Sequence, residues 1–310
     1  MKITKENIAK PFVKWAGGKS QLIHEIDKAI QKNKNDKFTY IEPFVGGGAV
    51  LFWILEHFPN LEKVIINDIN PDLIITYKTI KSNVFDLIKI LKAWETEYHV
   101  FKELPEDRKE YYYKKRELFN SRAEDTITHS ALFIFLNRTC FNGLYRVNQS
   151  NGFNVPIGSY KTPMICDEDN LQSVNKALQK VDILNGDFSE TIKFTTNNTI
   201  FYLDPPYKPL SETSSFNSYS KDEFNDNEQI RLKEFCDKID LLGHRWILSN
   251  SDVKGKNPHD DFFDDLYQKY NIFRVKARRN INANGEKRGE LNELLIINYG
   301  YESRTLAINF

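Results

Sequence analysis

Three features are scarce in this sequence of 310 residues: cysteine, excess charge and long apolar runs. The three cysteines, Cys140, Cys166 and Cys236, have neither a metal-binding nor a redox spacing, which argues against a disulfide framework and suits a reducing compartment. Lysine plus arginine and aspartate plus glutamate both number 43, so no global field attracts a polyanion. A nucleic-acid site therefore has to come from local clusters of basic residues.

No run approaches the ~18 apolar residues that a membrane span needs. The opening segment MKITKENIAKPF also lacks the apolar stretch of a signal peptide. The six histidines have no ligand spacing, so we expect no metal site. These absences predict a cytoplasmic protein that does not enter a membrane, and we expect it to be a monomer.

The order of strand-like and helix-like segments predicts an α/β fold. Residues 38–69 have the pattern of strand, glycine loop, helix and strand, which is a βαβ unit. Residues 71–179 are charged, aromatic and mainly helical in pattern. Strand-like runs then resume with KVDILNGDF, NTIFYLDPPY, HRWILSNS and YNIFRVKARR, and LNELLIINYG can form a β-hairpin with the run before it. We therefore expect a sheet domain that is interrupted by a helical insertion.

The glycine loop of the βαβ unit is a candidate cofactor site. Gly46 and Gly48 allow a ligand to approach the backbone, and Asp68 ends the next strand 22 residues after Gly46. An acid at about 20 residues from such a loop can accept hydrogen bonds from both hydroxyls of a ribose. A plain strand-to-helix turn explains the glycines equally well when they are taken alone. Trp15 and Lys19 of FVKWAGGK either form a surface turn or close over this loop.

The segment TIFYLDPPY ends a buried strand in an acid and two prolines, which cannot continue a central strand. Asp204 offers a carboxylate, Pro205 and Pro206 fix the direction of a backbone carbonyl, and Tyr207 offers an aromatic face. Two acceptors and a stacking surface suit an amino group on a planar base. The same acceptors stabilise the positive charge that develops on the nitrogen when it takes a methyl group from a sulfonium. A purely structural proline corner is the weaker explanation.

Seven segments in this order resemble the DNA adenine N6-methyltransferases of the Dam/DpnM group, alpha class. They are FVKWAGGK, EPFVGGGAV, NDIN, FNGLYRVNQSNGFNVPIGSYKTP, GDF, DPPYKPLSETSSFNSY and RRNINANGEKRGELNELL. The resemblance covers nearly the whole chain. It implies a Rossmann-like methyltransferase sheet with a terminal β-hairpin, S-adenosylmethionine as the methyl donor, and a flipped adenine in double-stranded DNA as the acceptor. It also implies GATC as the target. The resemblance further implies a methyltransferase domain of residues 1–75 and 168–310 around a mainly helical target-recognition domain of residues 76–167.

Site residues are carried over by matching motif positions. The resemblance implies catalytic roles for the residues of the DPPY corner, Asp204, Pro205, Pro206 and Tyr207. It implies cofactor contacts for Trp15, Lys19, Phe44, Gly46, Gly48, Asp68, Asp187, Phe188 and Asp204. Asp187, which follows a strand, is alternatively a turn cap.

The segment from Arg138 to Lys161 interleaves basic and aromatic residues, as a DNA-binding loop or a solvated loop with packing aromatics would. By resemblance, Phe141 and Asn142 wedge into the duplex, and Arg146 reads a guanine. The remaining residues expected at the DNA are Lys14, Arg138, Leu144, Pro156, Tyr160, Arg278 and Arg279.

The sequence thus predicts a site-specific adenine DNA methyltransferase with possible roles in restriction–modification, DNA replication or mismatch repair. Whether a restriction endonuclease accompanies it does not follow from the sequence. Two other hypotheses remain open. One is an amino-methyltransferase with another recognition sequence or another base, and the other is a catalytically silent DNA-binding relative.

Overall fold

The computed structural model describes residues 8–208, 224–278 and 290–300, apart from residues 16, 18, 20, 21 and 256; for residues 276–278 and 290–292 it describes the backbone alone. These ranges form a seven-stranded sheet in the order β3-β2-β1-β4-β5-β7-β6. The strands are β1 (Thr39–Glu42), β2 (Lys63–Asp68), β3 (Val181–Asn185), β4 (Thr199–Leu203), β5 (Arg245–Ser251), β6 (Asn271–Arg278) and β7 (Glu290–Ile297).

Strands β1 to β5 are parallel, and β7 runs antiparallel between β5 and β6. The expected α/β sheet, with strands from both sides of a helical insertion and a terminal antiparallel pair, is confirmed. The sequence did not indicate that β7 would lie inside the sheet. Because parallel strands end at one edge, Asp68 at the end of β2 and Asp204 after β4 lie at the same edge of the sheet, where ligands bind in folds of this kind.

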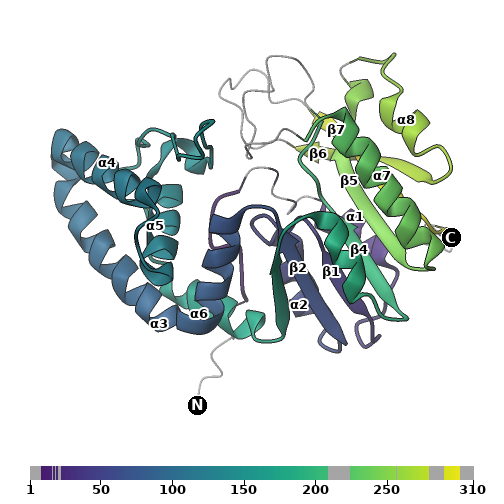
Figure 1. Cartoon of the computed structure of the whole chain (residues 1–310), viewed down its shortest axis with the longest axis horizontal. Helices are drawn as coiled ribbons and strands as arrows, with labels where there is room; N and C mark the ends of the chain where they lie inside the picture. The colour runs from purple at the N-terminus through teal and green to yellow at the C-terminus, as the bar shows by residue number, and fades with distance from the viewer. Residues whose placement is uncertain are drawn as a thin grey trace, which may run out of the picture.

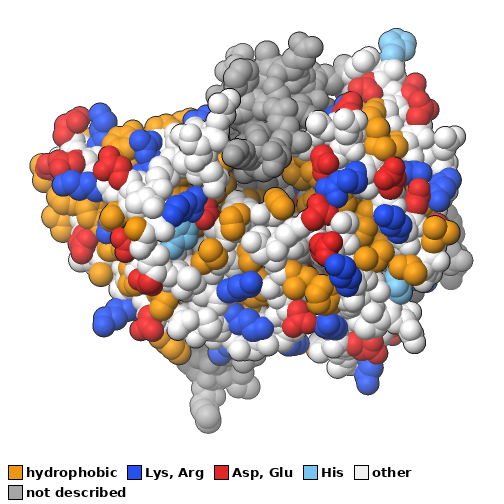
Figure 2. Space-filling view, viewed as in Figure 1, with side chains coloured by type: hydrophobic (Ala, Val, Ile, Leu, Met, Phe, Trp, Pro, Cys, Tyr) orange, Lys and Arg blue, Asp and Glu red, His pale blue; other side chains and the backbone are white. Residues whose placement is uncertain are grey.

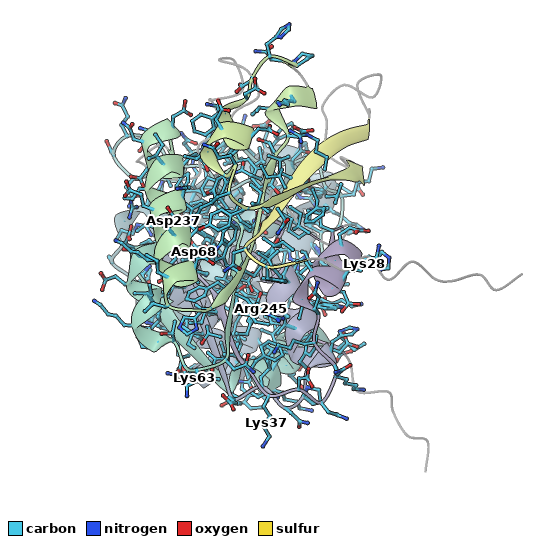
Figure 3. The ribbon with its side chains drawn as sticks, turned by 90° about the vertical axis from the view of Figure 1, so that its right-hand side faces the viewer. Lys28, Lys37, Lys63, Asp68, Asp237 and Arg245 are labelled. Carbon is cyan, nitrogen blue, oxygen red and sulfur yellow. The ribbon has the colours of Figure 1, made fainter. Side chains whose placement is uncertain are left out.

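Helices cover both faces of the sheet, because successive strand residues point to opposite sides. Tyr40 belongs to the core cluster that includes α1, whereas its neighbour Ile41 belongs to the cluster that includes α7. In Figure 3, Lys28 of α1 and Asp237 of α7 lie on opposite sides of the sheet. The helices around the sheet are α1 (Ile23–Ile30), α2 (Ala49–His57), α6 (Glu168–Leu178), α7 (Asp226–Leu241) and α8 (Phe262–Leu266).

The chain between β2 and α6 is a helical lobe, seen beside the sheet in Figure 1. Its elements are α3 (Pro71–Val100), η1 (Phe101–Glu103), α4 (Pro105–Ser121), α5 (Thr126–Thr139) and η2 (Phe141–Gly143). Helices α3 and α5 pack against each other, and their buried side chains join the same hydrophobic cluster as the sheet residues. The expected helical insertion is therefore confirmed, and it shares a core with the sheet.

Helix α3 begins two residues after β2. The lobe is therefore attached to the edge of the sheet at which the parallel strands end. Pro71 occupies the first helical turn, where its missing N–H costs nothing. The side chain of Asn70 accepts hydrogen bonds from the backbone N–H groups of Asp72 and Leu73. This N-cap satisfies donors that would otherwise have no partner at the start of the helix. At Asn83 the backbone leaves helical angles, so α3 is interrupted within the lobe.

Positive and negative side chains are interspersed over the face drawn in Figure 2, in agreement with the equal numbers of basic and acidic residues. Among the described residues, no helix is long and apolar enough to cross a membrane. In the same part of the chain, no three His, Cys, Asp or Glu side chains come together in a way that could hold a metal ion.

Candidate active site

The loop after β1 is shaped by glycine. Gly46 and Gly48 have φ of 49° and 78°, which side-chain-bearing residues rarely adopt. A Cβ at Gly46 would lie 2.9 Å from the indole ring of Trp15, and one at Gly48 would lie 2.5 Å from the hydroxyl of Tyr77. Tyr77 also donates a hydrogen bond to the Gly46 carbonyl at 3.0 Å. The loop is thus a shallow cradle that any larger residue would fill.

Asp68 contacts this loop directly. Its Oδ2 accepts a hydrogen bond from Gly46 N at 3.0 Å, and its Oδ1 accepts one from Asn70 N at 2.9 Å. Burial raises the pKa of Asp68, although these backbone donors oppose the shift. The carboxylate therefore joins the glycine loop to the start of α3, and the residues expected to surround a ribose are brought together.

Asp204 is paired with Lys19 at the end of β4. Lys19 Nζ lies 3.0 Å from Asp204 Oδ1 and donates to the Gly17 carbonyl at 2.7 Å. The same ammonium lies 4.4 Å from the centroid of the Tyr207 ring. Ser249 of β5 donates to Asp204 Oδ1 at 3.0 Å. Burial raises the pKa of Asp204, while Lys19 and Ser249 act in the opposite direction.

The Asp-Pro-Pro-Tyr corner is held by polar side chains from three other elements. Tyr207 donates its hydroxyl to Glu293 of β7 at 2.7 Å. Gln229 of α7 donates to the Pro206 carbonyl at 3.2 Å and accepts from Asn250 at 3.1 Å. Gln229 and Asn250 are fully buried. The corner therefore has a fixed backbone and a fixed ring.

Asp187 and Phe188 follow β3. Arg231 of α7 binds both carboxylate oxygens of Asp187, at 2.9 and 2.8 Å, and the backbone N–H of Ser189 donates to Oδ1. Burial raises the pKa of Asp187, but the hydrogen bonds from Arg231 and Ser189 outweigh it and lower the pKa to about 2. The ring of Phe188 lies 5.2 Å from that of Phe44, so these two expected cofactor residues form one aromatic surface.

The segment from Arg138 to Lys161 exposes several of the residues that we expect to contact DNA. Phe141, Asn142, Arg146 and Pro156 are exposed, whereas Leu144 and Tyr160 are half-buried. Asn142 has φ of 54°, which turns the chain at its tip. Arg146 Nε donates to Asn154 Oδ1 at 2.7 Å, so the guanidinium is positioned across a narrow hairpin.

Lys14 and Arg138 connect this segment to the start of the described chain. Lys14 Nζ lies 3.9 Å from the centroid of the Tyr160 ring. Arg138 donates from Nη2 to the Phe12 carbonyl at 2.8 Å, and burial lowers the pKa of its guanidinium. The Arg138 side chain therefore engages protein backbone, which its pattern in the sequence did not indicate. The side chain of Arg278 and the whole of Arg279 lie outside the described residues.

The sequence did not predict several of the side chains that hold the site. They lie on elements far from the motifs that they support: Arg231, Gln229, Ser249, Asn250 and Glu293. Glu42, at the end of β1, is buried, accepts from the Tyr40 hydroxyl at 2.8 Å, and has a pKa well above its ordinary value because of burial. A strand-end acid before the glycines was the available signal for Glu42.

A seven-stranded sheet with one antiparallel strand, a glycine loop after β1 and an acid at the end of β2 defines the class of S-adenosylmethionine-dependent methyltransferases. The sequence model of the family described as "D12 class N6 adenine-specific DNA methyltransferase" matches residues 15–281. The chain belongs to this family, and it is an adenine-specific DNA methyltransferase.

Three curated relatives match almost end to end. The type II methyltransferase M.MjaIII of Methanocaldococcus jannaschii is 48% identical and covers 94% of this chain and 99% of its own. The DNA adenine methylase of Haemophilus influenzae is 38% identical over 93% of each chain. The type II methyltransferase M1.LlaDCHI of Lactococcus lactis subsp. cremoris is 36% identical over 94% of this chain and 96% of its own.

The cofactor of this family is S-adenosylmethionine, and the residues of the crevice fit it. Glycine at positions 46 and 48 lets Trp15 and Tyr77 pack directly against the backbone of the loop, which gives it an aromatic border. Asp68 is partly exposed, as an acceptor for a diol has to be, and the partly exposed Phe44 packs against the buried Phe188. When bound, S-adenosylmethionine supplies the methyl group from its sulfonium.

Proposed function

We propose that this enzyme methylates N6 of an adenine that is flipped out of duplex DNA and held at Asp204, Pro205, Pro206 and Tyr207. The observation that carries the proposal is the set of groups at this corner: a half-buried carboxylate, a rigid backbone and a half-buried aromatic ring. The carboxylate and the Pro205 carbonyl accept the two N–H bonds of the amino group. Tyr207 stacks on the base.

The Lys19 contacts support this chemistry. A carboxylate and an aromatic face that hold an ammonium at 3.0 and 4.4 Å also stabilise the positive charge that develops on N6 as it takes the methyl group. N6 forms its bond to the methyl carbon while the carbon–sulfur bond breaks, and N6 then releases one proton to solvent.

Methyl transfer from labelled S-adenosylmethionine to a duplex that contains GATC tests the proposal. Asp204→Ala is expected to abolish transfer, because it removes the acceptor for the amino group. Asp182→Ala is a matched control, since Asp182 also belongs to a strand but makes only a surface ion pair with Lys63. If Asp204→Ala transferred label at the control rate, the role of the corner would be wrong.

We further propose that the carried-over cofactor residues act together with the cradle. Trp15 packs over the loop, Asp68 accepts the ribose hydroxyls, and Phe44 and Phe188 contact the adenine ring of the cofactor. The proximity of these groups to one another supports this assignment. Asp187 acts through the orientation of Phe188, because Arg231 already binds both of its carboxylate oxygens.

Residues 76–167 are proposed to form the target-recognition domain, and residues 1–75 and 168–310 the methyltransferase domain. The first boundary falls within α3, close to its interruption at Asn83. Phe141 and Asn142 are proposed to enter the duplex, with Leu144, Pro156, Tyr160 and Lys14 beside them. The exposed tip with its left-handed Asn142 supports this orientation.

GATC is the proposed target, and Arg146 is the proposed guanine reader. A bidentate contact of arginine with guanine discriminates bases by about 1–3 kcal/mol, so Arg146→Ala should reduce the preference for GATC over single-base variants by roughly 5- to 150-fold. Cofactor affinity should change little. Methylation rates on a set of substituted duplexes measure the preference, and an unchanged preference would refute the role of Arg146.

Two of the relatives are named type II methyltransferases, which supports a role beside a restriction endonuclease. The relative named DNA adenine methylase supports the alternative of a methyltransferase that acts alone. We propose that the enzyme works as a monomer on DNA in the cytoplasm. Mapping N6-methyladenine in host DNA, with and without the gene, would establish the target and separate GATC from another recognition sequence.

A further inference from the structure

A buried aspartate, Asp72, gathers three side chains from different parts of the helical lobe. Tyr145 donates its hydroxyl to Asp72 Oδ2 at 2.7 Å, and His129 Nε2 lies 2.9 Å from Oδ1. Arg122 donates to the same Oδ1, and its other terminal nitrogen donates to the Asn151 carbonyl at 3.3 Å. Burial opposes ionisation, but these hydrogen bonds keep the pKa of Asp72 below its ordinary value.

Asp72 is close in the chain to the cofactor acid. Asp68 accepts a hydrogen bond from Asn70 N, and the Asn70 side chain accepts from Asp72 N. The carboxylate that is proposed to bind the ribose is therefore linked by two hydrogen bonds to the turn that carries Asp72. Asn70 and Asp72 are buried, so these two hydrogen bonds offer a path by which a change in the position of Asp68 reaches Asp72.

Tyr145 also contacts Trp15, one of the residues proposed to bind the cofactor. Its ring is stacked on Trp15, with 5.7 Å between centroids and 26° between planes. Trp15 also lies against the glycine loop so closely that a Cβ at Gly46 would approach it to 2.9 Å. The ring of Tyr145 thus contacts Trp15, and its hydroxyl contacts Asp72, which is linked to Asp68 through Asn70.

Tyr145 is also part of the recognition hairpin, defined here as residues 145–155. It precedes Arg146, whose carbonyl accepts from Asn154 N at 3.1 Å, and Val147 pairs with Phe153 in an antiparallel bridge. Tyr145 is only 5% exposed, so it is fixed within the core while Arg146 beside it is exposed. The position of Tyr145 consequently sets the position of the hairpin.

We propose that Tyr145 is a positioning residue that couples cofactor binding to DNA binding, through its hydroxyl bond to Asp72 and its stack on Trp15. This rests on the proposed function, because it assigns the cofactor to the Trp15–Asp68 edge and DNA to the recognition hairpin. Cofactor binding fixes both contacts of Tyr145, which holds the hairpin in its DNA-binding position. Linkage requires that DNA strengthens cofactor binding by the same factor.

The coupling is measured with S-adenosylhomocysteine, which occupies the cofactor site without transferring a methyl group. The dissociation constant of a GATC duplex is determined without it and at saturation. In the wild-type enzyme the constant is expected to fall about fivefold or more. In Tyr145→Phe, which keeps the stack and removes the bond to Asp72, the ratio is expected to drop below about twofold. The reciprocal ratio for S-adenosylhomocysteine must change equally.

Tyr112→Phe is the matched control. Tyr112 is fully buried and donates its hydroxyl to the Val155 carbonyl of the same hairpin at 2.8 Å, but it has no bond to Asp72. Its variant should keep the wild-type ratio, and thermal unfolding of both variants shows whether they are equally folded. A ratio near one in the wild-type enzyme, or an unchanged ratio in Tyr145→Phe, would overturn the coupling. Absence of methyl transfer by the wild-type enzyme would instead contradict the proposed function.

Discussion

Asp204 combines two demands that oppose each other. In the role proposed for it, Asp204 has to be ionised to hold an amino group, yet its burial at the end of β4 raises its pKa. Lys19 and Ser249 counter this effect by binding the ionised carboxylate. These two contacts favour the ionised form of Asp204, and Lys19 is the one of the two residues that carries a positive charge.

Lys19→Met is therefore expected to move the acid limb of the kcat profile to higher pH. Removing the ammonium leaves burial less opposed, so the pKa of Asp204 rises further and the active carboxylate is lost earlier as the pH falls. The measurement is kcat at saturating DNA and cofactor from mildly acidic to neutral pH. Lys63→Met, which breaks a surface ion pair with Asp182, is the control and should leave the acid limb in place. An acid limb that did not move in Lys19→Met would contradict the role of the ion pair.

At the scale of elements, α7 supports the corner that follows β4. Gln229 bridges the Pro206 carbonyl and the Asn250 amide, and the side chains of Gln229 and Asn250 are both buried. A helix on one side of the sheet and the strand next to β4 thus help to hold this loop.

Gln229→Leu tests this support, because it conserves volume and removes both hydrogen bonds. Leaving buried polar groups without partners costs about 1–3 kcal/mol each in stability. We expect kcat to fall roughly tenfold or more, while the dissociation constant of the cofactor changes less than about threefold. Asn175→Leu is the control, since the Asn175 side-chain amide also makes two hydrogen bonds, to the carbonyls of Ile80 and Lys81, which belong to α3 and not to the corner. If both variants lost stability and neither lost kcat, the corner would not depend on Gln229.

Elements were more predictable from the sequence than contacts. Glycines and strand-end acids mark the βαβ unit locally, and proline marks the end of β4, so the strands and the crevice could be placed in advance. The contact of Glu293 with Tyr207 could not be predicted, because it depends on the pairing of β7 with β5. Arg231 could not either, since its pairing with Asp187 depends on how α7 packs on the sheet. Such partners are set by tertiary packing, which has no local signature.

At the scale of the whole molecule, the helical lobe and the sheet are discontinuous in sequence but continuous in their core. Leu91 and Phe135 of the lobe and Tyr40 and Ile66 of the sheet belong to one hydrophobic cluster. A shared core predicts that the two parts stabilise each other and do not unfold independently.

We therefore expect one cooperative unfolding transition. Trp94 lies in the lobe and Trp246 in β5, so variants that retain one of them as a reporter follow the two parts separately. Their fluorescence should change at the same denaturant concentration, and far-ultraviolet circular dichroism should change with them. Two separated midpoints would show that the lobe is an independent unit.

Strand β7 follows β5 and β6 in the sequence but lies between them in the sheet. During synthesis, β5 and β6 therefore emerge with a gap where their shared neighbour belongs, and each has an open edge. Open edges of this kind attract other strands, so a nascent chain at this stage is vulnerable to aggregation and is a natural client for chaperones. Glu293, which accepts the hydrogen bond from the Tyr207 hydroxyl, arrives on this late strand. A growing chain thus cannot assemble its methylating centre before the sheet is closed.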